Sequence, residues 1–231
     1  MGNRAMMKYG LFSVVTVTGA LGALVLTGST ARATLTESIS VPNSALSGFT
    51  GPYATVSITA VNPNTANIVF TSLTTNGVTF LMGDGGSADL NVNGTYTLGT
   101  VTPTGPASGG FAAPSFTGNS PGQVDGFGNF NLSLNLFNGY NSAANSISFQ
   151  ITNVNGLWTS DAAVVVNNAQ NSNAAIHAFA CTAPCTAAAG ALATGFAANG
   201  GSIPAPEPAS LALLGSALVG FGVFSRCRRR G

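Results

Sequence analysis

The only histidine of the chain, His177, is its candidate general base. A serine-type hydrolase also needs an orienting acid and a nucleophile around that base. Asp125 or Asp161 could supply the acid, but the sequence has no nucleophile motif such as Gly-x-Ser-x-Gly. His177 lies in the run Ala-Ala-Ile-His-Ala-Phe, which is typical of a strand. We therefore expect a hydrogen-bonded structural histidine, no catalytic residue and no enzymatic activity.

Two cysteines lie close together in Cys181-Thr-Ala-Pro-Cys185. In an exported protein, which the chain ends indicate below, an oxidising compartment favours a disulfide between them. A redox-active pair needs Cys-x-x-Cys, and this spacing is one residue longer. A metal site would need more ligands than these cysteines and His177. We expect a structural disulfide, with free thiols as the alternative.

An acidic, glycine-rich segment offers oxygen ligands of the kind that calcium prefers. It runs from Asp84 to Asp89 as Asp-Gly-Gly-Ser-Ala-Asp and is followed by Asn91 and Asn93. The segment lacks the spacing and the terminal glutamate of an EF-hand loop. Aspartate and asparagine also favour turns by bonding their own backbone. We expect a turn here, and no metal or cofactor.

Aromatic side chains could line a sugar-binding face, because their rings stack on sugars. The candidates are Trp158, Tyr53, Tyr96 and Tyr140, and their even scatter along the chain favours core packing instead. The run Thr100-Val-Thr-Pro-Thr104 is similar to an ice-binding face but lacks a regular Thr-x-Thr ladder. A carbohydrate-binding module is one alternative function, and a secreted hydrolase is the second.

The seven basic residues all lie near the chain ends, at Arg4, Lys8, Arg32, Arg226, Arg228, Arg229 and Arg230. Between Thr34 and Ser225 there is no lysine or arginine, and the six acidic residues give this span a formal charge of −6. A span without cations cannot neutralise phosphates, so we exclude nucleic acid as a partner. The many Asn, Ser, Thr and Gly residues must supply its solubility.

The elements that position these side chains are predicted to be strands. Apolar and polar residues alternate over 56–60, 130–136 and 147–151. This period of two indicates antiparallel strands with one buried face. Turn signals separate several such short runs. We therefore predict a mainly β protein, with an antiparallel β-sandwich or jelly-roll body.

Asn-Gly pairs are the strongest of these turn signals, and they occur at 76–77, 93–94, 138–139, 155–156 and 199–200. A two-residue turn at Asn76-Gly77 would place Leu73 opposite Phe80, which pairs two apolar residues. At Asn93-Gly94 a three-residue loop would place Val92 opposite Tyr96. We expect a hairpin with a bulge or longer loop at this second pair.

The N-terminal residues 1–33 have the order of a secretory signal peptide. Arg4 and Lys8 precede an apolar run over 11–26, and the small residues Ala31 and Ala33 form a cleavage site. We predict export by the secretion machinery and cleavage after Ala33 by signal peptidase. An uncleaved membrane anchor is the alternative.

The C-terminal run 209–225 is apolar over 17 residues. At 1.5 Å per residue a helix of this length spans about 25 Å, enough for a thin bilayer. We predict a single transmembrane helix. The basic residues that follow it, Arg226, Arg228, Arg229 and Arg230, would form a cytoplasmic stop by the positive-inside rule. The third cysteine, Cys227, would then lie on the cytoplasmic side.

Two prolines precede this run, in Pro206-Glu207-Pro208. Proline cannot continue a helix backwards and biases the preceding residue toward extended backbone. Glu207 would therefore be extended and exposed beside the membrane, where a membrane-embedded protease could recognise it. The alternative is a simple tail anchor whose prolines stop the helix.

The Pro-Glu-Pro motif, the apolar helix and the arginine cluster together resemble the PEP-CTERM sorting signal, over about residues 204–230. The same signal is also known as the C-terminal domain of ice-binding proteins, a label that would describe the tail alone. The resemblance implies an exosortase, an integral-membrane cysteine transpeptidase, that removes the tail. It also implies a Gram-negative host that makes exopolysaccharide and biofilm.

These observations divide the chain into a signal peptide at 1–33, a secreted β-rich domain at 34–203 and a sorting signal at 204–231. We expect a non-enzymatic structural or adhesive protein, anchored briefly in the inner membrane and then found at the cell surface or outside the cell. The resemblance implies exopolysaccharide as its partner.

If an exosortase reads Glu207, the substitution Glu207→Ala should leave the protein with its tail in the inner membrane. Removal of the carboxylate would take away the charged feature of the motif while both flanking prolines remain. Mass spectrometry of membrane and surface fractions measures the outcome. Processing at the wild-type level in this variant would count against recognition of the motif.

Overall fold

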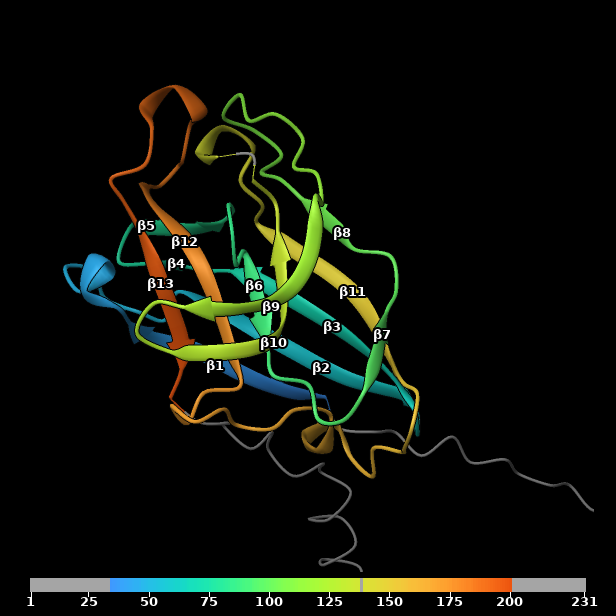
Figure 1. The fold of residues 1–231 in the computed structure, drawn as a ribbon. Helices are drawn as coiled ribbons and strands as arrows, with labels where there is room; N and C mark the ends of the chain where they lie inside the picture. Colours follow the sequence, from blue (N-terminus) through green and yellow to red (C-terminus); the bar gives the residue numbers. More distant parts are fainter. Residues whose placement is uncertain (1–33, 138, 201–231) are drawn as a thin grey trace, which may run out of the picture. The chain divides into compact units, whose positions relative to one another are not determined.

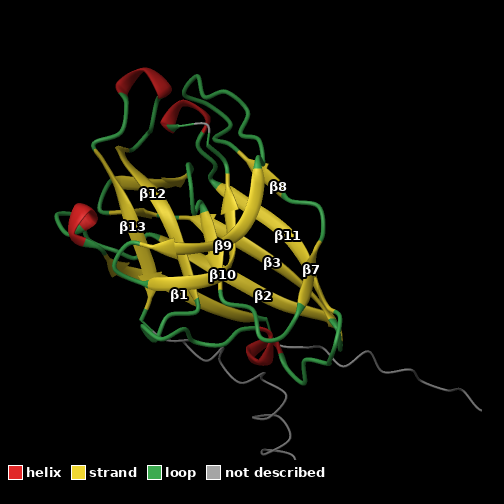
Figure 2. Ribbon diagram, in the orientation of Figure 1, coloured by secondary structure: helices red, strands yellow, loops and turns green. Residues whose placement is uncertain are grey.

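The computed structural model describes residues 34–137 and 139–200, which form an antiparallel β structure with four short 3-10 helices. Figure 2 shows strands throughout this body and helices only at its loops. The strands are β1 (Leu35–Pro42), β2 (Ala54–Asn62), β3 (Thr65–Ser72), β4 (Thr74–Thr75), β5 (Val78–Met82), β6 (Ala88–Leu90), β7 (Tyr96–Leu98), β8 (Thr102–Thr104), β9 (Gly118–Val124), β10 (Gly128–Asn135), β11 (Ser146–Asn153), β12 (Ala174–Thr182) and β13 (Ala193–Asn199). The 3-10 helices are η1 (Ser44–Leu46), η2 (Tyr140–Ser142), η3 (Asp161–Val164) and η4 (Ala187–Ala189).

Hydrogen-bonded neighbours join these strands into one curled sheet. Its main path runs β7-β11-β3-β2-β1-β13-β12-β6-β10-β9, while β4, β5 and β8 pair at its side. The β9–β10 hairpin curls back across β12 and β13 (Figure 1), and Phe130 and Val124 pack there with Ala175 and Ala198. The mainly β, antiparallel class is therefore confirmed. The predicted two sheets of a sandwich or jelly roll are joined here in one continuous ladder.

The alternating residues that predicted strands fill the main core. Val56 and Ile58 of β2, Leu132 and Leu134 of β10 and Ile147 and Ile151 of β11 are fully buried and belong to one hydrophobic cluster. Their polar neighbours in sequence face the other side of the sheet. Burial of these side chains supplies the main driving force for folding, at about 25 cal/mol per Å² of apolar surface.

The turn at Asn76-Gly77 forms as predicted. Both residues have positive φ, 50° and 78°, and the amide of Phe80 donates to the carbonyl of Leu73 at 3.0 Å. Positive φ at both central positions is what a tight hairpin turn needs, and Asn-Gly tolerates it. Phe80 is then fully buried, with its ring 4.7 Å from that of Tyr53.

The predicted hairpin at Asn93-Gly94 is wrong. Val92 forms a bridge with Val165, whereas Tyr96 pairs with Asn153 of β11. The segment therefore carries the chain from β6, which lies between β10 and β12, to β7 at the other end of the sheet. Val92 and Tyr96 pair with residues distant in sequence, and the local Asn-Gly turn signal could not reveal those partners.

The predicted signal peptide at 1–33 and the sorting segment at 204–231 lie outside the described residues. Within 34–137 and 139–200, no helix has both the length and the hydrophobicity that a membrane crossing requires.

Candidate functional site

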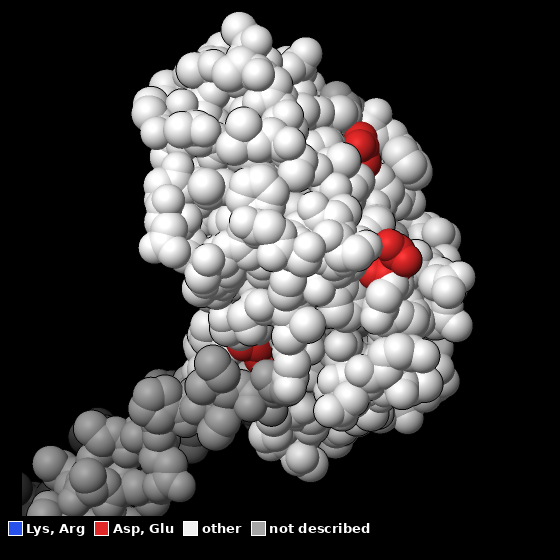
Figure 3. Space-filling view, turned by 90° about the vertical axis from the view of Figure 1, so that its left-hand side faces the viewer, with Lys and Arg blue, Asp and Glu red and all other residues white. Residues whose placement is uncertain are grey.

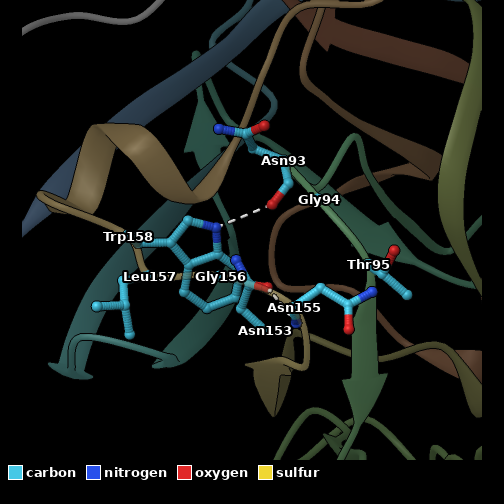
Figure 4. Close-up of a pocket in the computed structure, with 8 residues that line it drawn as sticks. All are labelled: Asn93, Gly94, Thr95, Asn153, Asn155, Gly156, Leu157 and Trp158. Atoms are coloured by element: carbon cyan, nitrogen blue, oxygen red, sulfur yellow. Dashed lines mark hydrogen bonds between the residues drawn. The ribbon is translucent and has the colours of Figure 1, made fainter.

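A shallow pocket of about 300 Å³ opens where the segments that follow β6 and β11 meet. It is lined by Asn93, Gly94, Thr95, Asn153, Asn155, Gly156, Leu157 and Trp158, drawn in Figure 4. Two of the five Asn-Gly pairs therefore meet across this site. All eight lining residues are uncharged.

Backbone hydrogen bonds hold the two segments in place. The backbone amide of Val154 donates to the carbonyl of Thr95 at 3.0 Å. The backbone amide of Trp158 donates to the carbonyl of Pro63 at 2.6 Å. The indole Nε1 of Trp158 donates to the carbonyl of Asn93 at 2.9 Å (Figure 4). Trp158 is only 2% exposed and packs in the main core, so its ring fixes the base of the pocket to the sheet.

Asn153, the last residue of β11, is the most informative lining residue. Its side chain is only 8% exposed, and its Oδ1 accepts a hydrogen bond from the amide of Asn155 at 3.1 Å. Its Nδ2 makes no hydrogen bond with any residue of 34–137 or 139–200. The Nδ2 atom is not fully enclosed, so its two N–H donors can reach water or a ligand in the pocket.

The remaining polar groups of the pocket are exposed. The side chains of Thr95 and Asn155 are open to solvent and form no hydrogen bond within the described parts of the chain. Leu157 is 70% exposed and adds an apolar wall. Donors, acceptors and one apolar side chain suit the binding of a neutral, hydroxylated ligand. The pocket offers no nucleophile paired with a base, so its chemistry favours binding over catalysis.

Comparisons with known proteins concern a different part of the chain. Residues 204–230 match the family model described as the PEP-CTERM protein-sorting motif. The chain carries a PEP-CTERM sorting motif. No curated protein and no solved structure is similar enough to the chain to count as a match.

The PEP-CTERM motif indicates a protein that an exosortase sorts after export, to the cell surface of a Gram-negative bacterium. The motif covers the C-terminal end only, so it indicates how the protein is sorted. The activity of residues 34–200 must be inferred from those residues themselves. The motif includes the predicted recognition residues Pro206, Glu207 and Pro208 and the basic residues from Arg226 to Arg230.

In the β body, His177 lies on β12, as its sequence pattern predicted. Its Nε2 is 2.8 Å from the hydroxyl oxygen of Thr194, and its ring stacks on Phe196 with centroids 4.5 Å apart. Burial lowers the pKa of His177, while the nearby negative charge of Asp84 acts in the opposite direction. Both contacts fit a structural histidine.

The acids proposed as partners of His177 lie elsewhere. Asp125 accepts a hydrogen bond from the side chain of Asn43 at 3.1 Å, and Asp161 accepts one from the amide of Ala60 at 2.7 Å. The structure therefore does not bring a His177-centred triad together with either acid.

Cys181 and Cys185 are joined by a disulfide, with their Cα atoms 5.5 Å apart. This confirms the predicted pairing. Cys181 packs in a small hydrophobic cluster with Leu81 and Phe179, on the face of β12 opposite the main core. The disulfide closes the connection between β12 and η4 over that cluster.

The acidic segment forms a turn, as predicted. The hydroxyl of Ser87 donates to the carbonyl of Asp84 at 2.6 Å, and the carboxylate of Asp84 accepts from the amide of Gly139. The side-chain Nδ2 atoms of Asn91 and Asn93 donate to the backbone carbonyls of Val166 and Ala163. The polar side chains of this segment therefore make separate local contacts.

The four named aromatic residues do not gather on one exposed face. Trp158 and Tyr53 are buried in the core, as the scatter predicted. Tyr96 and Tyr140 are half-buried, and their hydroxyls donate to the carbonyls of Asn131 and Thr186. Of these four residues, only Trp158 lines the pocket, and its buried ring forms the base.

The carboxyl group of Glu37 is buried, which was not predicted from the sequence. Its two oxygens accept hydrogen bonds from the side chains of Asn199 at 2.6 Å and Asn173 at 3.2 Å. Burial raises the pKa of Glu37, and these two hydrogen bonds partly oppose the rise. The signal was present: Glu37 lies between Leu35 and Ile39, at an inward position of the alternating strand β1.

A second buried carboxyl, Asp89, lies on β6 opposite Ser133 of β10. It is fully buried and neither oxygen accepts a well-formed hydrogen bond, although the hydroxyl of Ser133 partly favours its ionised form. Burial dominates and raises the pKa of Asp89 to about 7.

Asp89 should make the folding stability fall as pH rises. The folded protein retains the proton of Asp89 up to pH of about 7, whereas the unfolded chain releases it near 3.8. The free energy of unfolding should thus decline from pH ~4 to pH ~7, by up to about 4 kcal/mol at 1.36 kcal/mol per pKa unit. Asp89→Asn should remove the part of this decline that Asp89 contributes in urea unfolding across that range, and the raised pKa of Glu37 leaves a remaining slope.

The matched control is Asp125→Asn, because Asp125 is exposed. This variant should keep the wild-type pH dependence. An unchanged slope in Asp89→Asn would show that Asp89 does not carry the raised pKa.

Proposed function

We propose that the mature protein acts outside the cell as a non-enzymatic structural or adhesive component of the surface or extracellular matrix, in contact with exopolysaccharide. One observation carries this proposal: a PEP-CTERM sorting motif follows a body that has no lysine or arginine between positions 34 and 200. The motif delivers the body to the outside. The composition of the body limits what it can contact there.

The surface of the body is almost uncharged. Of its five acidic residues, Glu37, Asp89 and Asp161 are buried. The face in Figure 3 shows no basic side chain among the described residues and only small acidic patches. Attraction of a polyanion needs basic groups, so this surface favours contact with neutral polymers.

The absence of enzymatic activity is part of the proposal. A hydrolase would need His177 to meet both a hydroxyl and a carboxylate. The contacts of His177 include the hydroxyl of Thr194, but Asp125 and Asp161 bond other groups, and Asp84, whose charge acts on His177, accepts a hydrogen bond from the amide of Gly139. The pocket over Trp158 lacks ionisable residues altogether.

Fractionation of the host tests this role. The mature protein should remain with the polysaccharide matrix of the wild-type strain. It should move to the medium when synthesis of the exopolysaccharide is disrupted, because its binding polymer is then missing. An exosortase-deficient strain serves as the control, with the precursor held in the membrane fraction. The same distribution with and without the polysaccharide would contradict the proposed association.

A further inference from the structure

The pocket at the end of β11 contains one side-chain donor that has no partner among the described residues. Asn153 is more than nine-tenths buried and its Oδ1 is engaged, yet its Nδ2 has no partner within the described ranges. Figure 4 shows Asn153 beside Gly156, with Gly94 on the opposite segment. The donor atom itself is not fully enclosed, so a ligand oxygen can replace water as its partner.

Both glycines keep this donor accessible. A Cβ atom at Gly94 would lie 3.3 Å from Nδ2 of Asn153, and one at Gly156 would lie 3.5 Å from it. Any other residue at either position would therefore place a side chain on the donor. Gly94 also has a φ of +94°, which side-chain-bearing residues rarely adopt.

We propose that this pocket binds one unit of a neutral saccharide, with Nδ2 of Asn153 as the donor to a sugar oxygen. This inference rests on the proposed contact with exopolysaccharide and assigns that contact to a site. Sugar hydroxyls both donate and accept hydrogen bonds. The side-chain amide of Asn155 and the hydroxyl of Thr95 at the rim can do the same.

The other walls complete a saccharide site. Leu157, 70% exposed, offers an apolar surface for the C–H groups of a sugar ring. No lining residue carries a charge, so a uronic acid would lose hydration of its carboxylate without a cationic partner. The site therefore selects neutral sugars over acidic ones.

The pocket is also held in its binding shape before a ligand arrives. Trp158 packs in the main core, and its indole N–H donates to the carbonyl of Asn93 on the segment after β6. The backbone amide of Val154 donates to the carbonyl of Thr95 on the same segment. A site that is ordered in advance spends less binding free energy on ordering side chains and loops.

The test uses the mature protein purified from the surface of its host. Calorimetric titration with neutral hexose oligosaccharides should show binding, and uronic-acid oligosaccharides of equal length should bind far more weakly. Gly156→Ala should lower the affinity by about tenfold or more, because the added methyl group covers the donor and one lost hydrogen bond corresponds to roughly this factor. Thr95→Val should weaken binding through the loss of a rim hydroxyl.

Gly48→Ala is the matched control, because a Cβ there meets no atom within 4 Å. It should bind like the wild type, and thermal unfolding should show that all three variants fold. Thr95→Val keeps the proposal testable if Gly156→Ala disturbs the loop, because Thr95 is exposed.

Absence of binding to every neutral oligosaccharide, or wild-type affinity in both pocket variants, would overturn the site. Equal binding of the uronic-acid series would overturn the neutral class. The fractionation experiment separates this failure from failure of the proposed function. Retention in the matrix by the Gly156→Ala variant would reject the pocket as the contact and leave the matrix role intact.

Discussion

The body of this protein must manage its buried carboxyl groups without a single lysine or arginine. Between residues 34 and 200 no cation is available to pair with Glu37, Asp89 or Asp161. A buried carboxylate without compensation is costly, so each group needs another solution. Amides of Asn173 and Asn199 bond Glu37, the backbone of Ala60 bonds Asp161, and Asp89 retains its proton near neutral pH.

The same constraint connects the fold to the surface. The amide network around Glu37 joins β1 to Asn199 of β13 and to Asn173, the residue directly before β12. Amides and hydroxyls replace charges outside as well, where they keep the body polar but nearly neutral. A surface of this kind suits a neutral polymer, and the pocket at Asn153 offers the same chemistry in a concave, ordered form.

Local patterns were sufficient to predict the strand class, the Asn76-Gly77 turn, the disulfide and the sorting motif, because each depends on residues close in sequence. The Asn93-Gly94 pair shows where such patterns fail. Its role depends on pairing of β7 with β11, more than fifty residues away. The pocket arises from that same long-range pairing, so neither Asn153 nor Gly156 could be recognised from spacing alone. Glu37 was readable from its inward position in the alternation, but its amide partners were not.

The sorting motif and the predicted signal peptide together imply that the body reaches the outside of the cell without its tail. The intact mass of the protein recovered from the cell surface or the medium tests this directly. We expect a chain that begins at Thr34 and ends near Pro208, lighter by two hydrogens because of the Cys181–Cys185 disulfide. A chain from Thr34 to Gly231 found only in the inner membrane would contradict it, because the tail would then be a permanent anchor.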